Sequence, residues 1–356
     1  MTTSLALIPG DGIGVEVMDS ARRVLDRLAR VTGDSFDLTE LDWSCRRFLD
    51  RGAMMPEDGL EVLRRHDAVL LGAVGWPGVP DHVSLWGLLI PIRRAFGQYV
   101  NLRPVRTLDG VAGPLRPELA QGVDLLIVRE NTEGEYSEVG GRFGTGTPLE
   151  QAVQQSFFTR TGVERIARYA AQQAVARRGL VTAATKSNGI VHTMPFWDEV
   201  VTATVAEFPV SLRLEHVDAL AAKLVMSPRA FDVVLGSNLF GDILSDLAAG
   251  VCGSIGIAPS ANLDPTGANP SMFEPVHGSA PDIAGRGLAN PVGMLWSVVM
   301  MLDHLGMKEG SAMLMGAIEA SLRDPSTRTP DVGGTASTDD VTAAVVAALG
   351  PRGEPA

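Results

Sequence analysis

The sequence predicts an α/β protein with two domains. Short apolar runs alternate with amphipathic segments along the chain, which is the pattern of strands and helices in an α/β fold. The length of 356 residues exceeds what one compact core usually holds, so two domains are expected. A hydrophobic content of 45% is enough for well-buried cores, and no apolar run is long enough to cross a bilayer.

Individual elements follow from local patterns. We expect strands over five short apolar runs: 5–8, 68–71, 125–128, 181–184 and 233–235. Helices are expected over 15–28 and 163–176, where apolar residues, Val15 and Val175 among them, recur at helical spacing and are assigned to core faces. The Pro/Gly-rich segments 74–80 and 259–270 are expected to be loops, and the polar ending 351–356 to be frayed.

Charge and cysteine content restrict partners and compartment. A net charge of −12 favours solubility and argues against nucleic acid as a partner. The two cysteines, Cys45 and Cys252, allow at most one disulfide, and we interpret them as reduced, buried thiols of a cytosolic protein. The first apolar run leads directly into Pro9 and Gly10 rather than into a secretion signal, so we expect a cytoplasmic protein without a membrane partner.

The segment 238–246 places two carboxylates, Asp242 and Asp246, four residues apart on a predicted helix. Side chains at that spacing lie on one helical face. Such a pair can form half of an oxygen cage for Mg²⁺ or Mn²⁺. Most pairs of this kind are solvated surface, where like charges repel mildly, so a metal site needs support elsewhere in the chain.

Arginines supply that support. Arg93 and Arg103 lie in the run 93–104, Arg129 follows the strand-like run 125–128, and planar guanidinium groups suit carboxylates. Taken singly, each arginine is more often a surface residue than a ligand. Arg129 is the strongest candidate because it follows the apolar run 125–128, and strand ends in α/β proteins open into ligand crevices.

Seven blocks of the sequence, in the same order, resemble those of the isocitrate/isopropylmalate dehydrogenase family of metal-dependent, decarboxylating β-hydroxyacid dehydrogenases. These blocks are 8–14, 101–104, 128–134, 185–188, 216–218, 238–246 and 273–285. The chain is most similar to the tartrate and D-malate dehydrogenase branch. The resemblance implies a two-domain, isopropylmalate-dehydrogenase-like fold. Its first domain, 1–103 plus 253–356, is discontinuous and lies on the cofactor side, and its second domain, 104–252, forms a dimer and carries metal and substrate residues.

The resemblance also assigns catalytic roles. Oxidation of an alcohol needs a base, which is Lys186, and the enolate left after loss of CO₂ needs a proton, which Tyr136 donates. An ordinary lysine is protonated at neutral pH, so Lys186 requires a lowered pKa or a linked aspartate and water that accept the proton. Without the resemblance, Lys186 would be read as a surface residue and Tyr136 as a packing residue.

Binding roles are implied for three arginines and three aspartates. Substrate carboxylates are held by Arg93, Arg103 and Arg129, and Mg²⁺ or Mn²⁺ by Asp218, Asp242 and Asp246. A monovalent cation such as K⁺ is a further cofactor compatible with the family. Lys186 and Asp218 are implied to enter the site of the other subunit, in a homodimer or higher homo-oligomer with shared active sites.

A nucleotide site is implied at 277–290, formed by His277, Gly278, Ser279, Ala280, Asp282 and Asn290. The glycine-rich segment 10–14 imitates a dinucleotide-binding turn without the full G-x-G-x-x-G pattern. The Asp282 carboxylate can accept hydrogen bonds from ribose hydroxyls and repels a 2′-phosphate, which favours NAD. His277 is implied to contact adenine; without the resemblance it is as readily a packed histidine.

Substrate choice depends on the segment 81–90, which precedes Arg93. Trp86 stands where leucine-pathway relatives usually carry an acidic residue, which favours a small C4 substrate: D-malate, converted to pyruvate and CO₂, or tartrate. Leu89 and Ile90 could accept an alkyl group, so 3-isopropylmalate is the alternative substrate. A noncatalytic ligand-binding regulatory subunit is the alternative of another class, but such subunits typically lose a base, acid or metal ligand, and here all are present.

Overall fold

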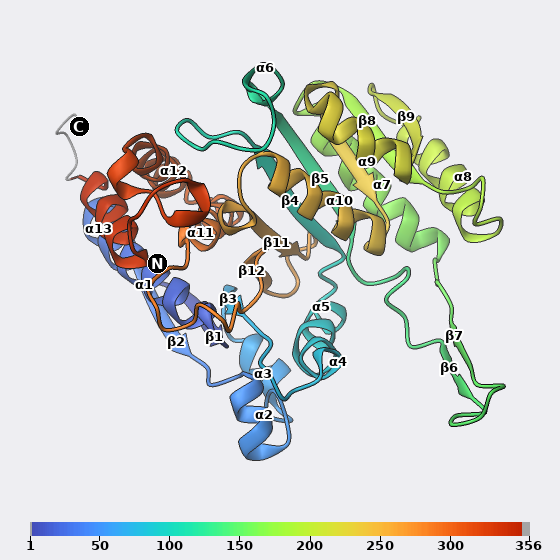
Figure 1. Ribbon diagram of the computed structural model, residues 1–356, viewed down its shortest axis with the longest axis horizontal. Coiled ribbons are helices and arrows are strands. Elements are labelled where there is room, and N and C mark those ends of the chain that lie inside the picture. The colour runs from blue at the N-terminus through green and yellow to red at the C-terminus, as the bar shows by residue number, and fades with distance from the viewer. Residues whose placement is uncertain (1, 351–356) are drawn as a thin grey trace. The chain divides into compact units, whose positions relative to one another are not determined.

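The computed structural model describes residues 2–350, and the chain divides into two compact units (Figure 1). The first unit comprises Met1–Gln98, Arg106–Gln121 and Ala249–Ala356, and the second comprises Tyr99–Val105 and Gly122–Ala248. The predicted domain boundaries near residues 103 and 253 remain a prediction.

The first unit contains five strands in the order β2-β1-β3-β12-β11. Their bounds are β1 Thr2–Gly10, β2 Ser35–Glu40, β3 Ala68–Ala73, β11 Pro259–Leu263 and β12 Ser271–Pro275. β1 is parallel to β2 and β3, and β12 is parallel to β3, whereas β11 runs antiparallel to β12. β3 is buried along its whole length, as expected for an inner strand covered on both faces.

The helices of the first unit cover these strands and connect them. The α-helices are α1 Ile13–Thr32, α2 Cys45–Arg51, α3 Gly59–Leu63, α4 Asp81–Ser84, α5 Ile90–Ala95, α6 Pro117–Ala120, α11 Val292–His304, α12 Lys308–Arg323 and α13 Thr338–Ala348. The short helices are the π-helix η1 Leu85–Leu89 and the 3₁₀ turns η3 Ile255–Ile257, η4 Pro325–Thr327 and η5 Pro330–Val332. α11 is almost wholly apolar and packs against β11 and β12, so it forms the centre of this core.

The second unit contains five neighbouring strands of the main sheet in the order β4-β5-β10-β8-β9. Their bounds are β4 Val100–Arg106, β5 Asp124–Glu130, β8 Leu180–Thr185, β9 Ser211–His216 and β10 Val233–Gly236. The helices are α7 Arg160–Val175, α8 Thr193–Val205, α9 Val217–Met226, the 3₁₀ turn η2 Pro228–Ala230 and α10 Asn238–Val251. A separate antiparallel hairpin, β6 Gly140–Phe143 and β7 Gln151–Gln154, projects from the unit (Figure 1).

Most expected elements are confirmed, and the exceptions have physical causes. All five expected strands and both helices form, and 74–80 is a loop. The expected loop 259–270 is wrong in its first part, which is β11; Pro259 occupies the first strand position, where its missing N–H is tolerated. Val15 and Val175 are 53% and 50% exposed, so their assignment to the core was wrong. The polar ending 351–356 lies outside the described residues.

Both cysteines are free and buried, as predicted. Burial raises the pKa of the Cys45 thiol to about 12 and that of Cys252 to about 11. Both thiols therefore stay protonated and are poor nucleophiles near neutral pH. Among residues 2–350, no helix is long and apolar enough to span a membrane.

Candidate active site

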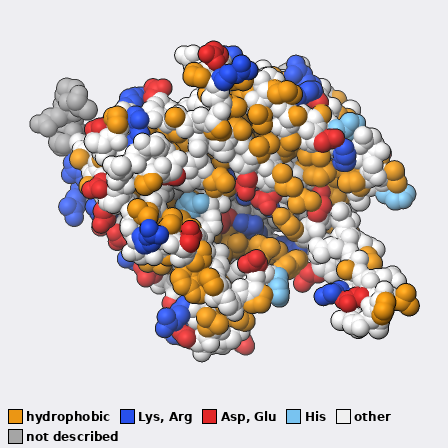
Figure 2. Space-filling view, in the orientation of Figure 1, with side chains coloured by type: hydrophobic (Ala, Val, Ile, Leu, Met, Phe, Trp, Pro, Cys, Tyr) orange, Lys and Arg blue, Asp and Glu red, His pale blue; other side chains and the backbone are white. Residues whose placement is uncertain are grey.

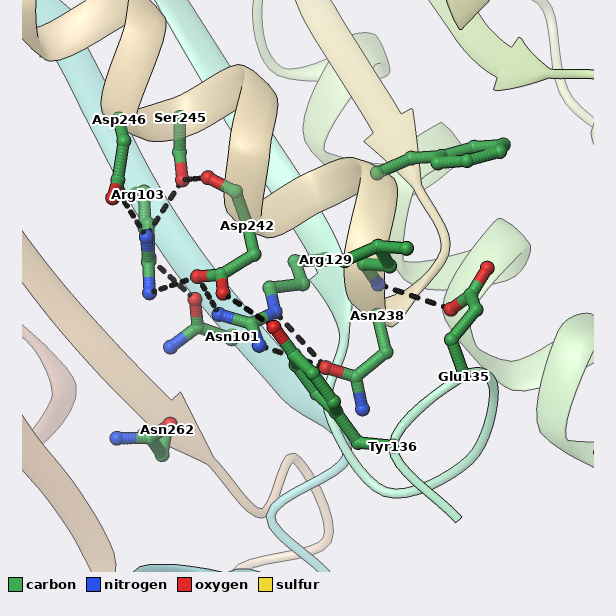
Figure 3. Close-up of polar contacts among 12 residues, drawn as sticks. Asn101, Arg103, Arg129, Glu135, Tyr136, Asn238, Asp242, Ser245, Asp246 and Asn262 are labelled. Atoms are coloured by element: carbon green, nitrogen blue, oxygen red, sulfur yellow. Dashed lines mark hydrogen bonds and ion pairs between the residues drawn. The ribbon is translucent and has the colours of Figure 1, made fainter. Parts of the chain in front are cut away.

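Arg129 lies at the end of β5 and is 3% exposed. Its Nε and Nη2 donate to Asn238 Oδ1 at 3.2 and 2.8 Å, and its Nη1 donates to Asp242 (Figure 3). Asn238 and Asp242 are one turn apart at the start of α10, so the guanidinium is held flat against that helix. The predicted strand-end arginine therefore has a fixed orientation.

The start of α10 is tied to the loop that carries Tyr136. Ser237 Oγ donates to Glu135 Oε1 at 2.7 Å, and the Leu239 N–H donates to Glu135 Oε2 at 3.0 Å. A carboxylate is favourable at this end of a helix because the first N–H groups lack partners within the helix. Glu135 thereby places its neighbour, Tyr136, beside α10.

The Asp242 carboxylate contacts three other residues of the site. Tyr136 Oη donates to Asp242 Oδ2 at 3.0 Å, and Arg103 Nη2 lies 3.2 Å from Asp242 Oδ1, where Arg129 also binds (Figure 3). The Arg129 guanidinium additionally lies 5.7 Å from the centre of the Tyr136 ring. One carboxylate thus joins the predicted acid to two of the predicted substrate arginines.

Arg103 connects the two aspartates of α10. Its Nη1 lies 3.0 Å from Asp246 Oδ1 and donates to Ser245 Oγ at 2.7 Å. Its Nε donates to Asn101 Oδ1 at 2.7 Å, and Asn101 is fully buried on the same strand, β4. Because residues two apart on a strand share a face, Asn101 holds Arg103 in place.

The environment of Tyr136 keeps its phenol protonated. Burial raises the pKa of Tyr136 above its ordinary value, and the negative charge of Asp242 adds to the effect. The phenol is therefore in its acid form at neutral pH. That is the form required of a proton donor.

The oxygens of Asp242 and Asp246 fit a hard divalent cation. Their side chains are 31% and 51% exposed, so lone pairs remain accessible beside the arginines. Carboxylate oxygens are the ligands that Mg²⁺ and Mn²⁺ prefer. Within residues 2–350, no group of three or more His, Cys, Asp or Glu side chains is arranged to hold a metal. The third predicted ligand, Asp218, is thus not gathered with the other two in one chain.

Lys186 and Asp218 form a pair of their own. Lys186 follows β8, Asp218 lies in the first turn of α9, and Lys186 Nζ is 2.9 Å from Asp218 Oδ1. The hydrogen bond from Lys186 lowers the pKa of Asp218. The Asp218 side chain is 67% exposed, so this pair is accessible from solvent.

Arg93 belongs to the first unit, where a buried carboxylate holds it. Arg93 Nη2 lies 2.6 Å from Glu274 Oε1, and Asn262 Nδ2 donates to the same oxygen at 2.7 Å. All three side chains are buried. Glu274 balances the charge of Arg93 and restricts its motion.

The predicted nucleotide residues occupy the segment between β12 and α11. The ring Nδ1 of His277 lies 2.9 Å from the Gly278 carbonyl oxygen, and burial lowers the pKa of His277, so the ring is neutral. The Asn290 side chain is engaged within the protein: its Nδ2 donates to Asp331, and its Oδ1 accepts from the Val292 N–H. Ser279 is buried and Asp282 is exposed.

Several residues of the site were not predicted. They are the polar partners that orient the charged groups: Asn101, Glu135, Asn238, Ser245, Asn262 and Glu274. Most lie within or beside the matched blocks, and Asn101 stands two residues before Arg103 on one strand, which is a usable signal. The others depend on tertiary contacts that spacing does not show.

The fold and this geometry define a class: α/β proteins in which buried guanidinium groups face two aspartates one helical turn apart, an arrangement suited to carboxylate-bearing ligands and a hard cation. A family model described as "Isocitrate/isopropylmalate dehydrogenase" matches residues 4–345. The chain belongs to this family.

Individual relatives agree with that membership. The chain is 51% identical over 341 residues to a protein named "Probable tartrate dehydrogenase/decarboxylase" from Bacillus subtilis (strain 168), covering 95% of each chain. It is 50% identical over 353 residues to "D-malate dehydrogenase [decarboxylating]" from Escherichia coli (strain K12), covering 97% of this chain and 98% of the relative. A crystal structure of isocitrate dehydrogenase from Methylococcus capsulatus matches with a TM-score of 0.87 at 32% identity, covering 98% of this chain and 99% of that one.

The prediction of a decarboxylating hydroxyacid dehydrogenase is confirmed. The chain is an enzyme of oxidative decarboxylation acting on a hydroxy acid. Members of this family generally use NAD or NADP and a divalent metal.

Proposed function

We propose that this chain catalyses the NAD-linked oxidation and decarboxylation of a small 2-hydroxy dicarboxylate, D-malate to pyruvate and CO₂ or tartrate, with Mg²⁺ or Mn²⁺. The observation that carries the proposal is the convergence of Tyr136, Arg103 and Arg129 on Asp242. It brings a proton donor, two carboxylate-binding groups and a metal-binding oxygen to one place. The names of the relatives from Bacillus subtilis and Escherichia coli support the substrate class.

Charge balance explains why substrate and metal should bind together. Arg103 and Arg129 offset Asp242 and Asp246, so the cluster is neutral as a whole. A dicarboxylate alone or a divalent cation alone would leave an uncompensated charge in a partly buried site, which is costly. A dianion and a dication bound together preserve neutrality. The arginines can then turn to the substrate carboxylates while the aspartates turn to the cation.

The protein groups divide the chemistry into two proton transfers. A divalent cation held by Asp242 and Asp246 would polarise the substrate oxygen, and nicotinamide would accept the hydride. Lys186 is the proposed base for the hydroxyl proton, and Asp218, 2.9 Å from Lys186 Nζ, is the charged partner linked to it. Tyr136 holds its proton until the carbon left after CO₂ loss needs it.

The His277 loop fits the adenosine part of NAD. With Nδ1–H donating to the Gly278 carbonyl, the neutral ring presents Nε2 as an acceptor. Nε2 is buried and has no hydrogen-bond partner among the described residues, and an amino group on a purine would satisfy it. The exposed Asp282 carboxylate suits ribose hydroxyls and opposes a 2′-phosphate.

The segment before Arg93 favours a short substrate. Pro91 lacks an N–H, and the Ile90 N–H donates to the Leu85 carbonyl, which makes η1 a π-helix. The half-buried Trp86 ring lies 5.0 Å from the guanidinium carbon of Arg94. A stacked indole at this position fills space instead of offering a charged or flexible side chain. We therefore place 3-isopropylmalate second.

Shared active sites in a homodimer are part of the proposal. Lys186 and Asp218 are accessible and are not gathered with Asp242 and Asp246 in one chain. The Lys186–Asp218 pair of one subunit can therefore complete the Asp242–Asp246 site of the other. The β6–β7 hairpin carries three exposed apolar side chains, Phe143 at 59%, Leu149 at 79% and Val153 at 44%. Figure 2 shows hydrophobic side chains on the projecting hairpin. Exposed apolar residues on a projecting hairpin favour burial against another copy of the chain.

A comparison of substrates tests the proposal. We expect purified protein with NAD and Mn²⁺ to turn over D-malate or a tartrate stereoisomer with kcat/KM at least about 10-fold above that for 3-isopropylmalate, because Trp86 stands where leucine-pathway relatives usually carry an acidic residue. The preferred substrate should be turned over more slowly with NADP. A preference for 3-isopropylmalate would replace the proposed substrate. Absence of metal-dependent turnover with all of them would favour a regulatory subunit.

Replacing Asp282 should shift the cofactor preference. In Asp282→Ala, we expect the ratio of kcat/KM for NAD to that for NADP to fall by about 10-fold or more, because repulsion of the 2′-phosphate is removed. The control is Asp58→Ala, which removes an exposed carboxylate that makes no capping hydrogen bond, although Asp58 stands at the N-cap position of α3. If the ratio changes equally in both variants, or in neither, Asp282 does not set the preference between NAD and NADP.

A further inference from the structure

The glycine-rich turn between β1 and α1 is filled by other parts of the protein. Gly12 has φ +58°, and a Cβ at this position would lie 2.0 Å from the Ser279 carbonyl oxygen. A Cβ at Gly10, with φ +71°, would lie 1.9 Å from the Ala73 carbonyl oxygen. The glycines therefore permit backbone segments to approach one another, rather than leaving space for a phosphate. In particular, the turn touches the proposed nucleotide loop.

Asp11 makes this turn rigid. The buried carboxylate accepts the Cys45 N–H at 3.0 and 3.1 Å and the Gly75 N–H at 3.1 Å, and the Asp11 N–H donates to the Ala73 carbonyl at 2.7 Å. These contacts connect the start of α2 and the segment after β3. The acidic residue of the motif is thus occupied within the protein, and the turn is a fixed platform.

Two hydrogen bonds connect this platform to the nucleotide loop. The Ile13 N–H donates to the Ser279 carbonyl at 2.8 Å, and the Gly285 N–H donates to Glu16 Oε1 at 2.5 Å. Ile13 and Glu16 lie in the first turn of α1, and Ser279 and Gly285 are the two ends of the segment 279–285. Between them, Ala280 has φ +37°, a left-handed conformation that alanine rarely adopts. A strained backbone persists only where its surroundings hold it.

We infer that Glu16 is a positioning residue for the cofactor: by fixing Gly285, it holds the 279–285 segment in the strained shape that presents Ser279 and Asp282 to NAD. This inference rests on the proposed nucleotide role of the His277 loop. Glu16 does not touch the reacting atoms, so it acts on cofactor affinity and not on the chemical steps.

The test compares Glu16→Ala and Glu16→Gln with Asp19→Ala, which removes an exposed carboxylate from the same helix. The quantities are the dissociation constant for NADH by fluorescence titration, KM for NAD, KM for the hydroxy acid, kcat, and the thermal midpoint. For Glu16→Ala we expect the KM for NAD and the NADH dissociation constant to rise about 10-fold, with kcat and substrate KM within about 2-fold of wild type. Glu16→Gln should largely restore affinity because its amide oxygen can accept the Gly285 N–H. Asp19→Ala should match wild type.

The outcomes separate this inference from the proposed function. Wild-type protein that neither binds NADH nor uses NAD would contradict the proposed cofactor, and the inference with it. Wild-type protein that binds NADH, with Glu16→Ala binding equally well, would overturn the positioning role alone. A rise in substrate KM and a fall in kcat as large as the loss of NADH affinity, without rescue by Glu16→Gln, would also overturn the positioning role. Such a result would indicate general damage to the fold.

Discussion

Asp242→Asn should reduce kcat/KM by about 1000-fold or more and weaken Mn²⁺ binding, while the protein remains folded. The carboxylate is a proposed metal ligand. It also accepts a hydrogen bond from Tyr136 Oη and forms ion pairs with Arg103 and Arg129. The asparagine oxygen can still accept one of these hydrogen bonds, but the charge that balances Arg129 is lost. Mn²⁺ affinity by calorimetry, steady-state rates and thermal midpoints are the measurements.

Tyr136→Phe provides the matched comparison for this result. It removes the proposed acid without removing a metal oxygen, so turnover should fall while Mn²⁺ affinity stays near that of wild type. Unchanged Mn²⁺ affinity in Asp242→Asn would contradict the assignment of this carboxylate to the metal. Equal loss of Mn²⁺ affinity in both variants would indicate damage to the site as a whole.

Mixing two inactive variants should restore activity if the sites are shared. Lys186→Ala should lack the proton acceptor, and Tyr136→Phe the proton donor. If Lys186 serves the other subunit, a mixed dimer has one site with both defects and one intact site, so a random mixture should recover up to about one quarter of wild-type activity.

The control for this experiment is the exchange of subunits, followed by native mass measurement of differently tagged chains. Rescue should appear only as mixed dimers form. If mixed dimers accumulate and activity stays at the level of the separate variants, Lys186 acts within its own subunit or is not the base. A chain that remains monomeric at working concentrations would contradict the shared site itself.

The sequence predicts which segments form strands and which charged residues form the site, but it does not predict the residues that contact them in the folded chain. Strands such as 68–71 are apolar along their length, because both faces of an inner parallel strand are covered. β11 was missed because Pro259 and Asn262 resemble loop residues, yet Asn262 is fully buried and bonded to Glu274. Local preference is overridden there by a tertiary partner that lies 12 residues away in sequence.

The same limit applies to the candidate site. Helical spacing predicts Asp242 and Asp246, and a strand end predicts Arg129; the structure brings all three together with Tyr136. Their neutral partners, such as Asn238, cannot be predicted in this way because a buried amide has no pattern of its own in a sequence. Glu16 is not predicted because its partner Gly285 is 269 residues away in sequence.

The most direct test of the account is the simultaneous measurement of NADH and CO₂ from D-malate by the purified wild-type chain, with Mn²⁺ and after its removal by a chelator. We expect NADH and CO₂ to form in equal amounts with Mn²⁺, both to stop on chelation, and both to resume when Mn²⁺ is restored. NADH formation without CO₂, or undiminished turnover after the metal has been removed, would contradict a metal-dependent decarboxylating mechanism centred on Asp242.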